Sequence, residues 1–542
     1  MGSTYSKPSS AARSTPHSNG FSCRRIASRF MPMAIFPMSE ASFVALQESL
    51  DHGVFCGLGR GIVNRPSRAD RGVYPRGPLH AVESRLGDNR PWVAKGTTMS
   101  ESITRRSFVA GAAATAAAGL ATPRPAAAAD KPAVLGGTPV HKGGWVAWPQ
   151  WDASWEPGIL DVFRSRHWCS AGASGKVGDF EKAYAQLHGA RRCVATASGT
   201  TALITALYVA GVDAGDEVIT SPFTFNATYN AVLMHKALPV FADTDPASLT
   251  MDPDSIESRI TDRTRAILPV HIYGIPCDMD RINAIAKKHK LAVVEDACQA
   301  WLGEYKGRKC GTLGDLGCFS FQESKHIPAG EGGAITGMNI ELLDRCRSFI
   351  NCGRATGTFK GSGCFTRGSN FRMKTYQAAL LLAQVEKLVR ETEVRRANAD
   401  YLTAGLKQIP GIHPVRLPEN SRAVWHLYPF RYDAAAFHGL PHGKFIRALN
   451  AEGIPCGGGY SEQYFDGMFD EAIASRGFQR LFSPERLKAY RDSFQELKGN
   501  RQVCQTTVTM YQSMLLAERS AMDDIIAAVR KIHAHSAELA KA

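Results

Sequence analysis

The chain has 542 residues, of which 44% are hydrophobic, 21% charged and 9% aromatic. This composition is typical of a globular protein with a large buried core, and it excludes collagen-like, coiled-coil and wholly disordered chains. The formal net charge is +14, but nine of these charges fall in residues 1–129. Since no basic stripe interleaved with aromatic residues follows, we expect no nucleic-acid partner.

The first 129 residues are expected to lie outside the fold. Residues 1–98 are rich in Ser, Arg, Gly and Pro without a sustained hydrophobic period, so we expect a disordered or wrongly annotated extension. Residues 99–129 (MSESITRRSFVAGAAATAAAGLATPRPAAAA) resemble a twin-arginine export signal, with Arg105 and Arg106 before a short Ala/Gly run. An Ala-rich linker is the alternative.

The signal decides the expected location of the protein. If it is functional, Met99 is the true start and the protein is exported to the periplasm. Otherwise the protein is expected to be cytoplasmic. The apolar run is short and only weakly hydrophobic, so we expect no stable membrane insertion.

Strands and helices alternate from about Phe180 onward. Apolar segments predict strands over 192–198, 216–222, 238–245, 264–274, 291–297, 315–321 and 332–336. Amphipathic segments predict helices over 180–190, 199–211, 226–237, 254–260, 279–290 and 340–350, and a long helix over 378–406. Strands that are apolar throughout and alternate with helices predict an α/β fold whose mostly parallel sheet is covered on both faces. The rest mixes short strands with helices and predicts a smaller α+β C-terminal domain.

Residues suited to one cofactor fall at the ends of these strands. Asp296 follows one strand, Ser320 ends another, and Lys325 stands shortly before the glycine-rich GEGG. Pyridoxal phosphate needs a lysine amine, an acid at its ring nitrogen, and donors for its phosphate. Gly199 and Thr200 open a helix directly after a strand, which suits an anion. Taken alone, the lysine is typical of a solvated charge, the aspartate of a helix cap, and the Gly-Thr pair of a turn. Together, in this order on this strand pattern, they are much more specific for a pyridoxal-phosphate site.

Several segments resemble the DegT/DnrJ/StrS family of pyridoxal-phosphate-dependent sugar aminotransferases. They are, in chain order, SPFTFNATYNAVL, LPVFADTDP, LPVHIYGIPCDMD, VEDACQA, SFQESKHIPAGEGGAIT and GSNFRM. The segments VLGGTPV, WPQWD and CGR are most similar to the branch with scyllo-inosose aminotransferases and aminohydroxybenzoate synthases. The resemblance implies transferase fold type I, with a large cofactor domain over 130–375. An interdomain helix and a small C-terminal domain would cover 376–542, and the protein would be a homodimer with shared active sites.

The resemblance also assigns roles to single residues. It makes Lys325 the Schiff-base lysine and proton shuttle, and Asp296 the partner of the pyridinium nitrogen. The other cofactor-binding residues that it implies are Gly199, Thr200 and Ser320 at the phosphate, Phe225 and Gln299 at the ring, and Asn370 at the phosphate of the partner subunit. Phe225 also reads as an ordinary core residue and Asn370 as part of a turn. His271 and Tyr273 would line the substrate side, although a buried histidine satisfied by the backbone fits equally well.

The implied reaction moves an amino group from glutamate or glutamine to a keto-sugar, free or nucleotide-linked, or to a keto-cyclitol. Some relatives carry histidine in place of the lysine and perform dehydration, so Lys325 favours transamination. Two alternatives stay open: a dehydratase or aromatising enzyme of the same fold, and a non-catalytic sugar-sensing protein. The thirteen cysteines form no CxxC pair, and we expect no metal site.

Overall fold

The computed structural model describes residues 131–170 and 174–542. The predicted extension over 1–98 and the predicted signal over 99–129 lie outside the described residues. A seven-stranded sheet organises the first part of the described chain, in the order β1-β9-β8-β5-β4-β2-β3. Its strands are β1 Arg192–Thr196, β2 Glu217–Thr220, β3 Leu238–Phe241, β4 Thr264–Leu268, β5 Ala292–Asp296, β8 Leu316–Ser320 and β9 Gly333–Gly337.

The pairing within this sheet confirms the predicted α/β class. β9 runs antiparallel to both of its neighbours, β1 and β8. The pairs β2/β3, β2/β4, β4/β5 and β5/β8 are all parallel. The sheet is therefore mostly parallel, and its parallel strands end along one common edge.

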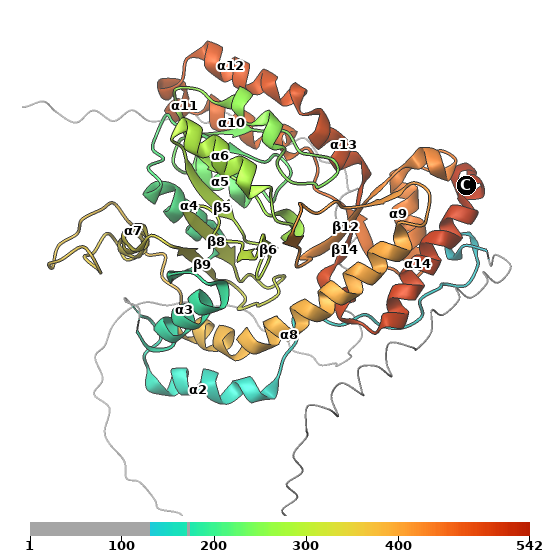
Figure 1. The fold of residues 1–542 in the computed structure, drawn as a ribbon, viewed down its shortest axis with the longest axis horizontal. Coiled ribbons are helices and arrows are strands. Elements are labelled where there is room, and N and C mark those ends of the chain that lie inside the picture. Colours follow the sequence, from blue (N-terminus) through green and yellow to red (C-terminus); the bar gives the residue numbers. More distant parts are fainter. Residues whose placement is uncertain (1–130, 171–173) are drawn as a thin grey trace, which may run out of the picture. The chain divides into compact units, whose positions relative to one another are not determined.

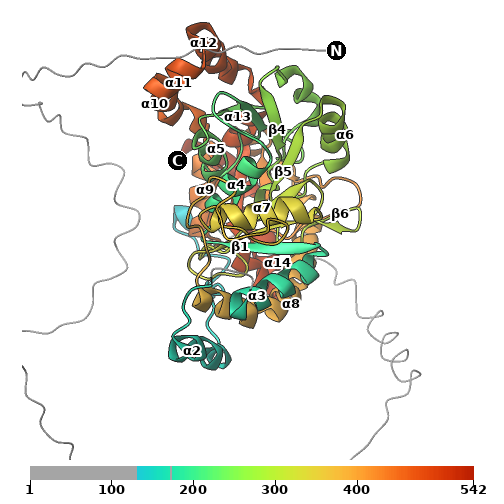
Figure 2. The same cartoon turned by 90° about the vertical axis from the view of Figure 1, so that its left-hand side faces the viewer.

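Helices cover both faces of the sheet. They are α3 Gly175–His188, α4 Gly199–Val209, α5 Ala227–Leu233, α6 Met279–His289 and α7 Ile340–Ile350. One apolar core joins α3 and α6 to the sheet through residues such as Phe180 and Ile282, and a second joins α4 and α7 through Leu203 and Leu343. Figure 2 shows α3 and α7 on opposite sides of β1. Strands with two covered faces need apolar residues at consecutive positions. These strands therefore do not alternate between apolar and polar residues.

A second, antiparallel sheet has the order β10-β12-β14-β13. Its strands are β10 Ile412–Pro414, β12 Leu427–Tyr432, β13 Cys456–Gly458 and β14 Thr507–Tyr511, and its helices are α9 His442–Ala451, α14 Arg519–Ala534 and α15 Ser536–Lys541. The long helix α8, Thr375–Leu406, packs on α3 at one end and on α14 at the other. Figure 1 shows α8 running beneath both sheets. It therefore contacts both parts of the described chain.

The remaining elements complete the two parts. They are α2 Glu156–Ser165, α10 Met468–Ala474, α11 Arg476–Leu481, α12 Pro484–Asp492, α13 Lys498–Thr506, and a small sheet of β6 Glu304–Tyr305, β7 Arg308–Lys309 and β11 Ser421–Arg422. Within the described ranges, no helix combines the length and the apolar character needed to cross a bilayer.

Two segments cross the division expected near residue 375. Leu135, Val140 and Trp145 pack against the core around the second sheet. In the other direction, Phe478 of α11 and Tyr490 of α12 belong to the core around the first sheet. Burial of these apolar side chains decides where each segment packs, so the two parts are not continuous stretches of sequence.

Glu295 of β5 holds the loop that precedes β8. Its side chain is fully buried. The carboxylate accepts backbone N–H bonds from Gly311, Leu313 and Gly314, each 2.7 Å long. His271 Nε2 lies 2.9 Å from the same carboxylate. The carboxylate thus accepts hydrogen bonds from four buried donors. A side chain that cannot accept all four would leave at least one of these donors unpaired.

Glu295→Gln is therefore expected to destabilise the protein by about 3 kcal/mol, because an amide N–H₂ would face a backbone N–H that has lost its acceptor. Urea unfolding followed by circular dichroism measures this loss. Glu386→Gln on the exposed face of α8 is the control and should change stability by less than about 0.5 kcal/mol. Equal stability of the two variants would contradict the account given for Glu295.

Candidate active site

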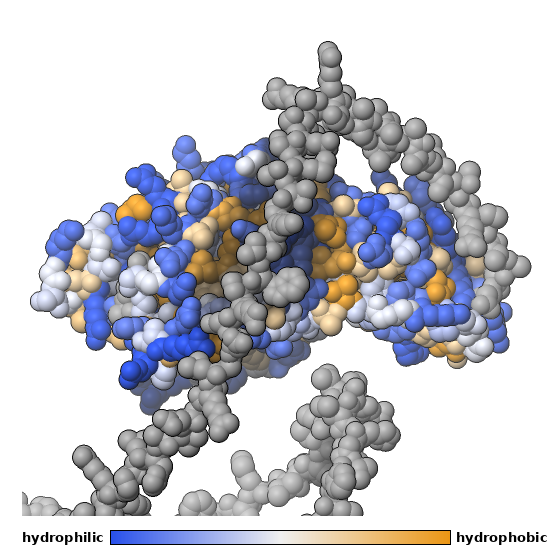
Figure 3. Space-filling model, turned by 90° about the horizontal axis from the view of Figure 1, so that it is seen from below, coloured by the Kyte–Doolittle hydropathy of each residue, from blue (hydrophilic) through white to orange (hydrophobic). Residues whose placement is uncertain are grey.

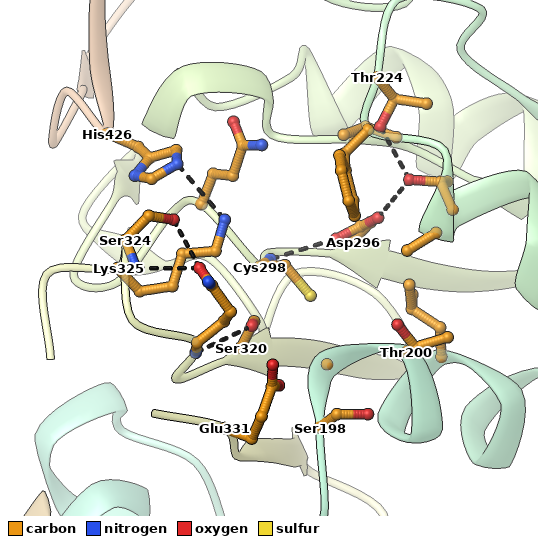
Figure 4. A pocket seen from close by; sticks show the side chains of 18 of the residues that line it. Ser198, Thr200, Thr224, Asp296, Cys298, Ser320, Ser324, Lys325, Glu331 and His426 are labelled. Atoms are coloured by element: carbon orange, nitrogen blue, oxygen red, sulfur yellow. Dashed lines mark hydrogen bonds between the residues drawn. The ribbon is translucent and has the colours of Figure 1, made fainter. Parts of the chain in front are cut away.

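A cavity of about 520 Å³ opens where the parallel strands end. Asp296 at the end of β5 and Ser320 at the end of β8 form part of its floor, and the N-terminus of α4 forms one wall. Lys325 and His426 enter it from the opposite side (Figure 4). Both the place and the volume are typical of small-molecule sites in α/β proteins.

The structure brings most of the predicted site residues together. The predicted residues that line this cavity are Gly199, Thr200, Phe225, Asp296, Gln299, Ser320 and Lys325. Asn370 does not line it; this residue is exposed and forms an isolated bridge with Asn351. His271 and Tyr273 are buried outside it.

His271 has a structural role, as the alternative interpretation proposed. Its Nδ1 accepts the backbone N–H of Cys277 at 3.0 Å. The proton is therefore on Nε2, which donates to Glu295 at 2.9 Å. Tyr273 supports the site from outside the cavity: its N–H donates to Gln299 Oε1 at 2.8 Å, and its ring stacks on that of Tyr460 with centroids 5.7 Å apart. Gln299 Nε2 in turn donates to the hydroxyl of Tyr460 at 3.1 Å.

The carboxylate of Asp296 is held in one orientation. Thr228 Oγ1 donates to Oδ2 at 2.7 Å, and the backbone N–H of Cys298 lies 3.2 Å from Oδ1. Since the Thr228 proton is used in this way, Thr228 accepts the hydroxyl of Thr224 at 2.7 Å. Asp296 is only 5% exposed. A fixed, nearly buried anion at a cavity wall suits a cationic group of a bound molecule.

The N-terminus of α4 is open to an anion. Ser198 caps the helix by accepting the N–H of Thr201 at 3.1 Å. The amides of Gly199 and Thr200 precede this bond and point out of the helix end. A Cβ at position 199 would stand 2.7 Å from Ser320 Cβ and 3.0 Å from Cys298 Sγ. Glycine is therefore required where the helix meets β8, and the free amides and helix dipole suit a phosphate.

Lys325 presents its amine in the same cavity. Nζ lies 3.3 Å from His426 Nε2, and the Lys325 carbonyl accepts the indole N–H of Trp148 at 3.2 Å. Burial lowers the pKa of the Lys325 amine, although Cys298, Asp296 and Glu331 act in the opposite direction. A lowered pKa increases the share of neutral amine, which is the form that acts as nucleophile or base.

Other residues of the cavity were not singled out from the sequence. Thr228 and Cys298 lie beside predicted residues, and only the fold shows that they hold Asp296. His426 and Tyr460 come from the second part of the chain, more than 100 residues from their contacts in the first. No local pattern marks such long-range contacts. No cluster of three or more potential ligands in the described chain is arranged to hold a metal ion.

Comparison with known proteins agrees with this site. The model of the DegT/DnrJ/EryC1/StrS aminotransferase family matches residues 156–478. L-glutamine:2-deoxy-scyllo-inosose aminotransferase of Streptoalloteichus tenebrarius is 33% identical over 423 residues, which cover 75% of this chain and 98% of the relative. The enzyme of the same name from Streptomyces kanamyceticus is 34% identical over 427 residues, with 75% and 98% covered.

Solved structures show the same relationship. The crystal structure of 3-amino-5-hydroxybenzoic acid synthase superimposes with a TM-score of 0.63 at 27% identity, over 73% of this chain and 98% of that one. The family match spans more than half of the chain, and the curated relatives are covered almost completely. The chain belongs to the DegT/DnrJ/EryC1/StrS aminotransferase family.

Proposed function

We propose that this protein is a pyridoxal-phosphate-dependent aminotransferase that transfers the amino group of L-glutamine to a keto-cyclitol of the scyllo-inosose type. The observation that carries the proposal is the meeting of Lys325, Asp296 and the N-terminus of α4 in one cavity. The substrate class is supported by the relatives above, whose names give glutamine as donor and 2-deoxy-scyllo-inosose as acceptor.

The residues present fit pyridoxal phosphate. The amides of Gly199 and Thr200 and the hydroxyl of Ser320 would hold the phosphate, and Asp296 would pair with the ring nitrogen. Phe225 lines the cavity with 54% of its surface exposed, so its ring is available to cover a bound ring. These groups match the anion, the cation and the aromatic face of the cofactor.

When bound, pyridoxal phosphate supplies the electron sink for breaking the C–H bond of the amino donor. The carboxylate of Asp296, held by Thr228 and the N–H of Cys298, would accept the N–H of the ring nitrogen. Lys325 takes a proton from the α-carbon of the donor and later releases it. The amine must therefore be neutral in the first step and protonated in the second. Burial lowers the pKa of the Lys325 amine, which favours the neutral form that accepts the proton.

Mixing the purified protein, loaded with pyridoxal phosphate, with L-glutamine tests the proposal. We expect the yellow absorbance to be lost in a single turnover and to return when scyllo-inosose or 2-deoxy-scyllo-inosose is added, with the aminocyclitol detected by mass spectrometry. Glutamate as donor and keto-sugars as acceptors are the competing pairs. Formation of an aromatic product would instead favour the chemistry that the name of the benzoic acid synthase describes. No loss of absorbance with any donor would contradict aminotransfer.

We further propose a homodimer in which Asn370 completes the active site of the partner. Two observations support it. Asn370 is exposed outside its own cavity, and large apolar side chains are also exposed: Phe365 shortly before it in the chain, and Phe163 and Trp168, of which Phe163 stacks on Tyr376. Figure 3 shows apolar residues gathered toward the middle of the face seen from below, between mainly hydrophilic ends. Such a surface suits a second copy of the chain.

Mixing inactive variants tests the shared site. Lys325→Ala and Asn370→Ala should each be impaired as pure proteins, whereas refolded or co-expressed mixtures should regain activity, because mixed dimers hold one intact site. Light scattering measures the mass in parallel. A monomer, or mixtures with no gain over the pure variants, would contradict the proposal.

We propose, finally, that residues 99–129 direct export by the twin-arginine route. The support is the sequence motif, since these residues lie outside those described. Fusing 99–129 to a reporter enzyme tests this, because replacing Arg105 and Arg106 by lysines should keep the reporter in the cytoplasm.

A further inference from the structure

Buried polar side chains surround the contact between Lys325 and His426. His326 follows Lys325 in the chain, and its ring centroid lies 6.1 Å from that of His426. Arg395 of α8 and Gln512, just after β14, are fully buried and joined by a 2.8 Å bond from Nε to Oε1. Trp301 packs on both imidazoles, with ring centroids 5.0 and 5.6 Å away.

Several nitrogen atoms of this cluster have no hydrogen-bond partner among the described residues. They are His426 Nδ1, His326 Nδ1 and Nε2, Arg395 Nη1 and Gln512 Nε2. Leaving buried polar atoms unpaired is unfavourable, and proteins satisfy such atoms with ordered water. No direct bond joins the two imidazoles, whose ring centroids lie 6.1 Å apart, and one bridging water would satisfy a nitrogen of each.

The proton on His426 decides what Lys325 can do. Burial, with the neighbouring charges of Lys325 and Arg395, lowers the pKa of His426 well below its ordinary value, so the ring is neutral. If the proton is on Nδ1, Nε2 accepts an N–H from Lys325 and the amine keeps its lone pair free. If the proton is on Nε2, it donates to that lone pair, and the amine cannot act as a base.

We propose that His426 is a positioning residue that accepts an N–H bond from Lys325, and that His326 keeps the proton of His426 on Nδ1 through a bridging water. The inference rests on the proposed function, in which Lys325 moves the proton. Burial lowers the pKa of His326 well below its ordinary value, so the ring is neutral, and the nearby carbonyl of Trp425 acts in the opposite direction without forming a hydrogen bond. That carbonyl favours the N–H of His326 on its own side of the ring, which leaves the other nitrogen as the acceptor for the water.

The tautomer is tested directly, without turnover. Spectra of ¹⁵N-histidine-labelled protein, with and without cofactor, should show His426 protonated at Nδ1 in the wild type. His326→Phe keeps the ring volume but removes the acceptor, so we expect the His426 proton to move to Nε2. His235→Phe is the control: His235 bonds to the carbonyl of Ile204, and its loss should leave the His426 signal unchanged. A wild-type His426 protonated at Nε2 overturns the inference.

Kinetics test the consequence. His426→Phe should slow the single turnover with L-glutamine about 100-fold, because the amine loses its fixed direction, while the KM for glutamine stays unchanged. His426→Gln should recover most of this loss, since its amide oxygen can accept the same N–H. Deuterium at the α-carbon of glutamine should slow the His426→Phe variant further, which marks proton transfer as the affected step.

The two proposals fail in different ways. Borohydride labelling of Lys325 and a completed single turnover in the wild type test the proposed function alone. If both succeed, but His426→Phe and His326→Phe react at wild-type rates, the positioning role is overturned and the aminotransferase is not. If the wild type is neither labelled nor turned over, the proposed function itself is overturned.

Discussion

Lys325→Ala is expected to abolish amino transfer, lowering the single-turnover rate with glutamine on the order of 10⁴-fold. The expectation follows from the position of this amine. Among the described residues that line the cavity it is the only lysine, and burial lowers its pKa, which increases the share of the neutral amine that can take a proton. Stopped-flow absorbance measures the rate, and borohydride labelling followed by peptide mass spectrometry should find no modified peptide in the variant.

Two comparisons make this result specific. Lys306→Ala removes an exposed lysine that pairs with Asp280, and it should retain wild-type turnover. Adding a small primary amine such as methylamine to Lys325→Ala should restore part of the rate, because the truncated side chain leaves room for a base. Wild-type turnover in Lys325→Ala would show that another group moves the proton, and the assignment of this lysine would be wrong.

The regular part of the fold could be predicted from local patterns. The helix expected over 340–350 is α7, whose first turn is capped by Asn339. The helix expected over 199–211 begins at Gly199 behind the Ser198 cap. In both cases the capping residue and the apolar periodicity agree, and tertiary packing did not override them.

Other boundaries depend on contacts that the sequence does not display. The strand expected over 264–274 ends at Leu268, because the chain turns at His271 to meet Glu295, with Tyr273 at φ 55°. The helix expected over 254–260 consists of two short 3₁₀ turns, Pro253–Ser255 and Glu257–Arg259. A buried partner 24 residues along the chain therefore decides where the strand ends.

The candidate site divides in the same way. Asp296 and Ser320 could be predicted because parallel strands end along one edge, so residues at strand ends meet whatever the connections between them. His426 could not, because it reaches Lys325 from just before β12, a strand of the other sheet. Local patterns thus predict what the first sheet contributes, whereas the contribution of the second part depends on how the two parts pack.

Asp296→Asn is expected to lower turnover on the order of 10³-fold while leaving the fold and the cofactor site in place. Asparagine has nearly the same shape and can still accept the N–H of Cys298 and bond with Thr228. It carries no negative charge, so it cannot hold a proton on the ring nitrogen of a bound cofactor. Single-turnover rates with glutamine measure the loss, and the affinity for pyridoxal phosphate should change far less than the rate.

A cofactor analogue separates this role from a structural one. Pyridoxal phosphate methylated at its ring nitrogen is positively charged without any acid, so it should restore much of the rate of Asp296→Asn. Asp315→Asn is the matched control at the other end of β5, where the carboxylate only accepts the N–H of Val293; its rate should match the wild type and should not respond to the analogue. If Asp296→Asn is slow with the natural cofactor and equally slow with the methylated one, the charge of the ring is not what Asp296 maintains. The carboxylate would then act by orienting the ring, through the same bonds that Thr228 and Cys298 use to hold it.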